Sequence, residues 1–186
     1  RQAGEAIEYL TFVPDGEPTL DINLGQEIER LKPLGLPIAV ISNASLIWRK
    51  DVRRDLMDAD WVSLKVDAVE EAVWRRIDRP HGGLDLSSIL AGMLSFASEY
   101  AGELVTETML VSGVNDGDGN LKALAGFLER VRPDRAYLSI PTRPPAEPWA
   151  HAPDEQGVNR AYQILQSEVE QVECLIGYEG NAFAFT

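Results

Sequence analysis

The 186-residue sequence predicts an α/β fold built on a parallel sheet. Apolar runs alternate with amphipathic segments along the whole chain, as they do in repeated βα units. The apolar runs are nearly continuous, which is typical of parallel strands that are buried on both faces. The composition, 45% hydrophobic and 25% charged, is that of an ordinary globular protein, so we expect a single domain over residues 1–186.

Short apolar runs that end at turn residues carry the strand signal. They cover residues 7–13, 37–42, 61–66, 104–111, 136–140 and 173–176. The first run ends at Pro14-Asp15-Gly16 and the fourth at Gly113-Val114-Asn115-Asp116, and both sequences stop strands. Periodicity leaves two arrangements open, because an open doubly wound sheet and a closed barrel give the same alternation.

Amphipathic segments between these runs predict helices. They cover residues 20–34, 51–57, 69–77, 86–100, 121–131 and 154–171. In the first helix Ile22, Ile28 and Leu31 fall on one side. Pro33 is expected near its end, because proline cannot continue a helix. Asp154 is placed to cap the last helix, which follows a proline-rich loop.

Charge and cysteine content exclude several classes of partner. The net charge of −13 repels polyphosphates, which argues against nucleic-acid binding by this segment. No apolar run approaches the roughly 18–20 residues of a membrane helix, so no membrane partner is expected. Cys174 is the one cysteine and cannot hold a metal or an iron–sulfur cluster alone, so we expect no metal site in this chain. A reducing cytoplasm is the simplest location.

Candidate binding residues follow the first two strands, because parallel α/β proteins bind ligands at the carboxyl ends of strands. Gly16 would allow a ligand close to the backbone, and Glu17 could accept hydrogen bonds from an ammonium group. With Pro18, the same residues also suit the first turn of a helix, and the residues alone favour that interpretation. Ser42 and Asn43 end the second strand.

The third strand carries polar residues on one face. Ser63, Lys65 and Asp67 alternate with apolar neighbours, and burying them without partners would cost several kcal/mol. They either line a polar cavity or include a structural Lys65–Asp67 ion pair, and this strand alone favours neither. Glu107 and Ser139 repeat the pattern on the next two strands, which favours a cavity.

Two loop residues are candidates for contact with a substrate. His81 ends a segment rich in Arg and Asp, and it could transfer protons or contact a ligand. Arg143, in the proline-rich loop, could hold a carboxylate or a phosphate. Both also suit an ordinary surface position, which is the interpretation preferred for Trp149 and His151.

Taken together, these segments resemble the radical S-adenosylmethionine (SAM) superfamily. More narrowly, they are similar to a group of iron–sulfur oxidoreductases of unassigned substrate that is related to the wyosine-type tRNA-modification enzymes. The matching stretches are FVPDGEPTLD (12–21), ISNASLIW (41–48), SLKVDA (63–68), RRIDRPH (75–81), ETMLVSGVND (107–116), PTRPPAE (141–147) and GYEGNAFAFT (177–186). They follow the order of the family across nearly the whole chain.

The resemblance implies a partial (βα)₆ TIM-like barrel of parallel strands, truncated at the N-terminus. In the family, three cysteines spaced CxxxCxxC hold a [4Fe–4S] cluster that binds SAM. Reduction by a protein such as ferredoxin or flavodoxin leads to cleavage of SAM, and the resulting 5′-deoxyadenosyl radical abstracts hydrogen from the substrate. This chain lacks the cysteine triplet, so we expect it to be an inactive fragment of a longer protein.

The resemblance also assigns roles to residues of this chain. Gly16 and Glu17 match the element that meets the methionyl ammonium of SAM. The remaining matches to SAM-binding positions are Ser42, Asn43, Ser63, Lys65, Asp67, Glu107 and Gly113. The chain departs from the family in having Pro14-Asp15 before Gly16 and Asn43-Ala44 in place of Asn-Gly.

Two other functions stay open at this stage. The chain could belong to a cluster-free βα-barrel lyase or aldolase that uses Lys65 as a Schiff-base amine. It could also be a noncatalytic degenerate barrel that binds a partner through its acidic surface. An RNA substrate, suggested by the tRNA enzymes, conflicts with the charge of −13, and the sequence identifies no substrate.

Overall fold

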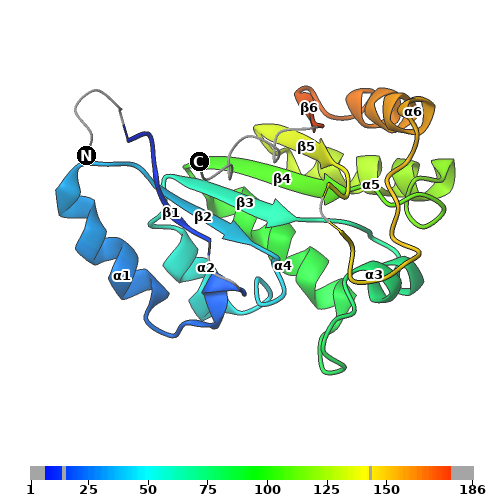
Figure 1. Cartoon of the computed structure of the whole chain (residues 1–186). Coiled ribbons are helices and arrows are strands. Elements are labelled where there is room, and N and C mark those ends of the chain that lie inside the picture. The colour runs from blue at the N-terminus through cyan, green and yellow to red at the C-terminus, as the bar shows by residue number, and fades with distance from the viewer. Residues whose placement is uncertain (1–6, 14–15, 143, 177–186) are drawn as a thin grey trace. The chain divides into compact units, whose positions relative to one another are not determined.

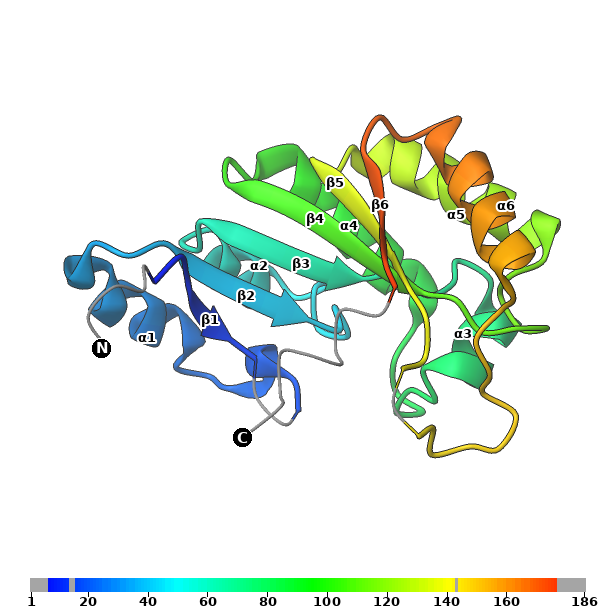
Figure 2. The same ribbon diagram turned by 45° about the horizontal axis from the view of Figure 1, so that its top comes forward.

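The computed structural model describes residues 7–13, 16–142 and 144–176. Strands alternate with helices and form one sheet in the order β1-β2-β3-β4-β5-β6 (Figures 1 and 2). The strands are β1 (Leu10–Phe12), β2 (Ile38–Ser42), β3 (Trp61–Lys65), β4 (Glu103–Met109), β5 (Arg135–Ser139) and β6 (Val172–Leu175). Neighbours in sequence are neighbours in the sheet, and the predicted parallel α/β fold is confirmed.

The helices fall where the amphipathic segments predict them. They are α1 (Leu24–Leu31), α2 (Lys50–Leu56), α3 (Glu71–Ile77), α4 (Leu86–Glu99), α5 (Asp118–Val131) and α6 (Glu155–Gln166). As predicted, Asp154 caps α6, because its Oδ1 accepts a hydrogen bond from the Gly157 amide at 2.8 Å.

Three elements are shorter than predicted. The strand expected at 7–13 is only Leu10–Phe12, paired along β2. The helix expected at 20–34 is α1 flanked by 3₁₀ turns at Pro18–Leu20 and Lys32–Leu34. At the C-terminal end, Pro33 lacks the amide that a longer α-helix needs. The last helix, expected to reach residue 171, ends at Gln166, where the Ser167 hydroxyl donates to the Ile164 carbonyl.

The chain divides into two compact units. The first unit comprises the described residues of Arg1–Lys65 and Ser87–Val105, and the second comprises those of Val66–Leu86 and Thr106–Thr186. The first therefore holds β1–β3, α1, α2 and nearly all of α4, and the second holds α3, α5, α6, β5, β6 and the end of β4.

In the first unit, α1 and α2 lie on the same side of β1–β3 (Figure 1). The core includes Ile28, Leu56 and Leu64, each fully buried. Helix α4 packs closely against the chain after β2, because a Cβ at Gly92 would lie 2.6 Å from the Ile47 carbonyl oxygen. Parallel pairing of β1 with β2 and of β2 with β3 brings their carboxyl ends to one edge.

In the second unit, β5 and β6 pair in parallel, and α5 and α6 lie side by side (Figures 1 and 2). Its core includes Leu121, Leu128, Leu138 and Leu165, each at most 1% exposed. This packing fixes the carboxyl end of β5 beside β6. The proline-rich loop begins there, after Ser139.

Candidate functional site

The side chain of Glu17 lies buried between the chain after β1 and the end of β2, with 7% of the residue exposed. Its Oε1 accepts hydrogen bonds from the Thr19 amide at 3.1 Å, the Thr19 hydroxyl at 2.7 Å and the Ser42 hydroxyl at 2.7 Å. Its Oε2 accepts from the Asn43 amide at 2.6 Å. The turn interpretation thus accounts for part of this geometry, because the bond from the Thr19 amide caps the 3₁₀ turn Pro18–Leu20.

The Glu17 carboxylate has only neutral donors as partners. Four hydrogen bonds offset much of the cost of removing a carboxylate from water. Within residues 7–13, 16–142 and 144–176, no Lys or Arg side chain forms an ion pair with it. Oε2 accepts one bond and retains a lone pair, so this buried charge is chemically suited to a cationic group.

The turn after β2 places Ser42 and Asn43 at this carboxylate. The Ser42 hydroxyl donates to Glu17 and accepts from the Ala44 amide at 2.9 Å. Asn43 offers its amide to Glu17, whereas its own side chain accepts from the Ser45 amide at 2.9 Å. Ala44 has a φ of 60°, a left-handed conformation that favours glycine. Ala44 therefore adopts the left-handed conformation that a glycine would adopt at this position.

The other candidate residues of the first unit contribute differently. Gly16 is exposed, and a Cβ there would meet nothing within 4 Å. Ser63, on β3 opposite Ile41 of β2, is 3% exposed. Lys65 ends the same strand and is half-buried.

In the second unit, Asp67 and Asn115 fasten the end of β4 to the segment that follows β3. Asp67, 2% exposed, accepts a hydrogen bond from the Met109 amide at 2.8 Å. The Asn115 carboxamide donates to the Asp67 and Met109 carbonyls at 2.9 Å each, and it accepts from the Val111 amide at 2.8 Å. Asn115 was predicted only as part of a strand-stopping turn. Its position in that turn, six residues after the end of β4, was a signal for such a bond.

Gly113 lies in the same turn and is exposed. Its φ of 66° falls in the left-handed region, which explains glycine at this position. Its amide donates to Asp116 Oδ1 at 2.8 Å. The turn is therefore held by its own side chains.

Glu107 projects from β4 toward Ser139 of β5. The Ser139 hydroxyl donates to Glu107 Oε1 at 2.9 Å, and both residues are half-buried. The structure therefore brings together two residues that strand alternation placed on one polar face.

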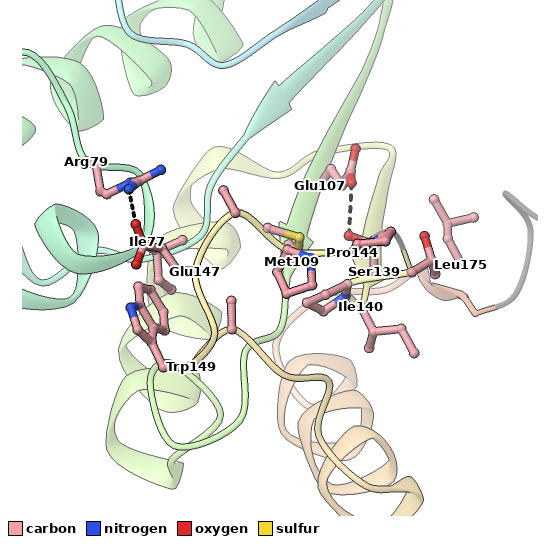
Figure 3. A pocket seen from close by; sticks show the side chains of 15 residues that line it. Ile77, Arg79, Glu107, Met109, Ser139, Ile140, Pro144, Glu147, Trp149 and Leu175 are labelled. Atoms are coloured by element: carbon pink, nitrogen blue, oxygen red, sulfur yellow. Dashed lines mark hydrogen bonds and ion pairs between the residues drawn. The ribbon is translucent and has the colours of Figure 1, made fainter.

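These two residues line a pocket of about 460 Å³ that lies within the second unit. Figure 3 shows Glu107 and Ser139 on one side of it and the Arg79–Glu147 ion pair on the other. Its apolar lining includes Met109, Ile140, Pro144, Trp149 and Leu175. The volume falls in the range of small-molecule sites. Met109 was not predicted as a site residue, and Trp149 was predicted to be an ordinary surface residue.

Of the two proposed substrate residues, only His81 belongs to the described part of the chain. His81 is exposed, does not line the pocket, and accepts a hydrogen bond at Nδ1 from the Gly83 amide at 3.1 Å. Arg143 lies outside the described residues. The cation that does line the pocket is Arg79, while Arg76 stacks over Trp149 with its guanidinium 5.1 Å from the ring centre.

No group of three or more His, Cys, Asp or Glu side chains that could hold a metal ion occurs in the described part of the chain. Cys174 lies on β6, where partial burial raises the pKa of its thiol. Among the described helices, none has the length and apolar character to span a membrane.

Solved structures of similar fold include a radical SAM methyltransferase from Sphaerobacter thermophilus, with a TM-score of 0.71 at 20% identity, covering 94% of this chain and 52% of that one. A domain of pyruvate-formate lyase-activating enzyme from Bacteroides vulgatus superposes with a TM-score of 0.72 at 21% identity, covering 89% of this chain and 97% of that one. TYW1 with a lysine–pyruvate adduct bound gives 0.70 at 21% identity, covering 87% and 51%. The chain therefore has the α/β fold of radical SAM enzymes, as the resemblance implied.

Curated relatives are similar over most of the chain. UPF0026 protein MJ1312 of Methanocaldococcus jannaschii is 45% identical over 184 residues, which are 98% of this chain and 57% of that protein. A UPF0026 protein of Helicobacter pylori is 39% identical, covering 74% and 45%. The chain thus spans about half the length of these relatives. An S-adenosylmethionine-dependent nucleotide dehydratase of a Thermoplasmatales archaeon is 30% identical over 69% of this chain. No protein-family model matches the chain.

Proposed function

We propose that these residues form the SAM-binding part of a radical SAM iron–sulfur enzyme. The fold shared with such enzymes supports the proposal, and so does a relative whose name includes dependence on SAM. In the full-length protein, SAM and a reduced [4Fe–4S] cluster would together supply a radical that removes hydrogen from a substrate. A cytoplasmic reductant such as ferredoxin or flavodoxin would supply the electron.

The observation that carries the proposal is the Glu17 carboxylate. It is buried at the carboxyl end of the first strands, fixed by four neutral donors and paired with no cation of the described residues. The methionyl ammonium of SAM would provide the missing positive charge, and a charged hydrogen bond is worth about twice a neutral one. Ser42 and the Asn43 amide would then be positioning groups, because they hold the carboxylate in place.

The remaining candidates have weaker support and stay part of the proposal. Ser63, Lys65 and Asp67 are assigned to the ribose and carboxylate of SAM, and Glu107 and the backbone to Gly113 to its adenine. These roles come from the resemblance. Asp67 also holds the Met109 amide, so it would combine a structural role with a ligand contact.

The cluster does not fit the residues of this chain. Three thiolates are needed, and the sequence has one cysteine. We therefore assign the cysteine ligands to a part of the full-length protein outside residues 1–186. No role in the cluster is assigned to Cys174.

The test is to reconstitute the full-length protein anaerobically with iron and sulfide and record its reduced EPR spectrum with and without SAM. A [4Fe–4S]⁺ signal that changes with SAM, together with formation of 5′-deoxyadenosine, is expected. Glu17→Gln should raise the SAM concentration needed for the spectral change by about tenfold or more, because a charged partner is lost.

Glu29→Gln is the matched control, since Glu29 is an exposed acid on α1 of the same unit. It should leave the spectral change where it is. A well-folded full-length protein that holds no cluster would overturn the proposal. Borohydride trapping of a carbonyl substrate on Lys65 would then be the next measurement, because it tests the Schiff-base alternative.

A further inference from the structure

The wall of the pocket of the second unit is mostly apolar, and its charged side chains lie at two places (Figure 3). On one side lie Glu107 and Ser139, and on the other lies the ion pair of Arg79 with Glu147. Between them Figure 3 shows Met109 and Pro144. A ligand here would find one polar contact at each end and apolar contact along its length.

The two polar ends differ in net charge. At one end Arg79 pairs with Glu147 and Arg76 lies over the Trp149 ring, so this end carries no excess negative charge. Glu107 receives a single hydrogen bond, from the neutral Ser139 hydroxyl, and within the described residues no Lys or Arg forms an ion pair with it. Among the described residues, this carboxylate therefore has no ion-pair partner and lies beside apolar surface.

We infer that this pocket binds a ligand that carries a cationic amine on an apolar body, with the amine at Glu107. A carboxylate with free acceptor positions selects a cationic donor, and a partly dehydrated wall strengthens the attraction. Ser139 occupies one position of the carboxylate and so orients the other oxygen. Met109, Ile140 and Leu175 would contact the apolar body.

This inference rests on the proposed function in calling the ligand a substrate, and it assigns Glu107 to that substrate in place of the adenine of SAM. Such a substrate would be a small molecule or a side chain that bears an amine. The acidic composition of the chain would also favour the approach of a cationic ligand, since the net charge is −13.

The test uses three probes of nearly equal size on the full-length protein. They are 2-phenylethylamine, which is a cation at neutral pH, neutral 2-phenylethanol and anionic phenylacetate. Ligand-observed NMR titrations would give their dissociation constants. The amine is expected to bind on the order of tenfold more tightly than the alcohol, the size expected for one charged hydrogen bond.

Variants locate the effect in the pocket. Glu107→Gln keeps the shape and should bring the amine to within about twofold of the alcohol. Glu103→Gln, on the same strand but outside the pocket lining, should leave the preference unchanged. Ala146→Trp should weaken all three probes, because it fills the pocket. Thermal melting confirms that each variant is folded.

Three results would overturn the inference. They are binding of phenylacetate as tight as that of the amine, an amine preference that survives Glu107→Gln, and displacement of the amine by SAM, which would make this the cofactor pocket. Because these titrations need no cluster and no reductant, their outcome is separate from the EPR test. If the protein cleaves SAM but does not prefer the amine, only this inference is overturned and the proposed function stands.

Discussion

Each unit places a glutamate near the carboxyl end of a strand, but the two glutamates are held very differently. Glu17 of the first unit is 7% exposed and accepts four hydrogen bonds. Glu107 of the second unit is half-buried and accepts one, from Ser139. Glu17 is thus fixed in one position, whereas most of the hydrogen-bonding capacity of Glu107 is left for a ligand.

The comparison shows that the number and type of hydrogen-bond donors decide whether a carboxylate is fixed by the fold or remains available to a ligand. Donors that come from the backbone, such as the Thr19 and Asn43 amides, tie the side chain to the fold and couple its loss to unfolding. A single side-chain donor, such as the Ser139 hydroxyl, orients the carboxylate and leaves its other acceptor positions to a ligand. We therefore expect mutations at Glu17 to affect stability and ligand binding together, and mutations at Glu107 to affect mainly binding.

The largest expected effect tests this contrast directly. Glu17→Ala should lower the free energy of unfolding of the full-length protein by about 3–4 kcal/mol, because it leaves buried donors unsatisfied. Glu107→Ala should lower it by only about 1 kcal/mol, since one hydrogen bond is lost. Urea unfolding measures both. Equal losses at the two positions would contradict the contrast.

The two units differ in how closely one helix glycine is packed in each. Gly92→Ala in α4 should cost about 2–3 kcal/mol, because its Cβ would lie 2.6 Å from the Ile47 carbonyl oxygen and the backbone cannot yield easily. Gly126→Ala in α5, where the Cβ meets nothing within 4 Å, should instead stabilise by about 0.5–1 kcal/mol. Thermal melting of both variants checks the pair, and a neutral Gly92→Ala would show that α4 can shift.

Asn115→Ala should cost about 2 kcal/mol, because one carboxamide makes three hydrogen bonds at a position that is 2% exposed. The matched control is Asn120→Ala, which removes a single longer bond of 3.2 Å to the Val114 carbonyl. Urea unfolding should show at most about 1 kcal/mol for the control. A larger loss at Asn120 than at Asn115 would show that the turn is held elsewhere.

The smallest effect concerns a surface ion pair of the first unit. Hydrogen bonding to the Arg49 guanidinium lowers the pKa of Asp51 from its ordinary 3.8 to about 2. A lowered pKa in the folded state means that this pair stabilises above about pH 4 and loses its contribution as the pH falls toward 2. An NMR titration of the Asp51 carboxyl should show this midpoint, and Arg49→Gln should return it to the ordinary value.

Alternation of apolar and amphipathic segments was enough to predict the order of strands and helices, because each signal extends over a whole element. Boundaries were less predictable where local bonds compete with the helix. Helix α6 ends five residues before the predicted limit, where the Ser167 hydroxyl bonds the Ile164 carbonyl, and Pro33 turns the end of the first helix into 3₁₀ geometry. These effects depend on single contacts that periodicity does not record.

For the candidate site, the sequence predicted which strand face or strand end a residue occupies. Alternation placed Glu107 and Ser139 on one polar face, and the structure brings them into contact. Trp149 and Arg79 could not be assigned in the same way, because they lie on loops whose path through space decides what they line. The roles assigned to Ser63 and Lys65 stay predictions until ligand binding is measured.

The Asn115 and Asp67 side chains also have a consequence for slow motions. They accept from the amides of Met109, the last residue of β4, and Val111, two residues further along the chain. Neither amide can exchange its hydrogen with solvent until a side-chain bond opens, and Asn115 also bonds the carbonyls of Asp67 and Met109. Both amides should therefore exchange in one cooperative opening, in step with each other, although strand ends usually fray residue by residue.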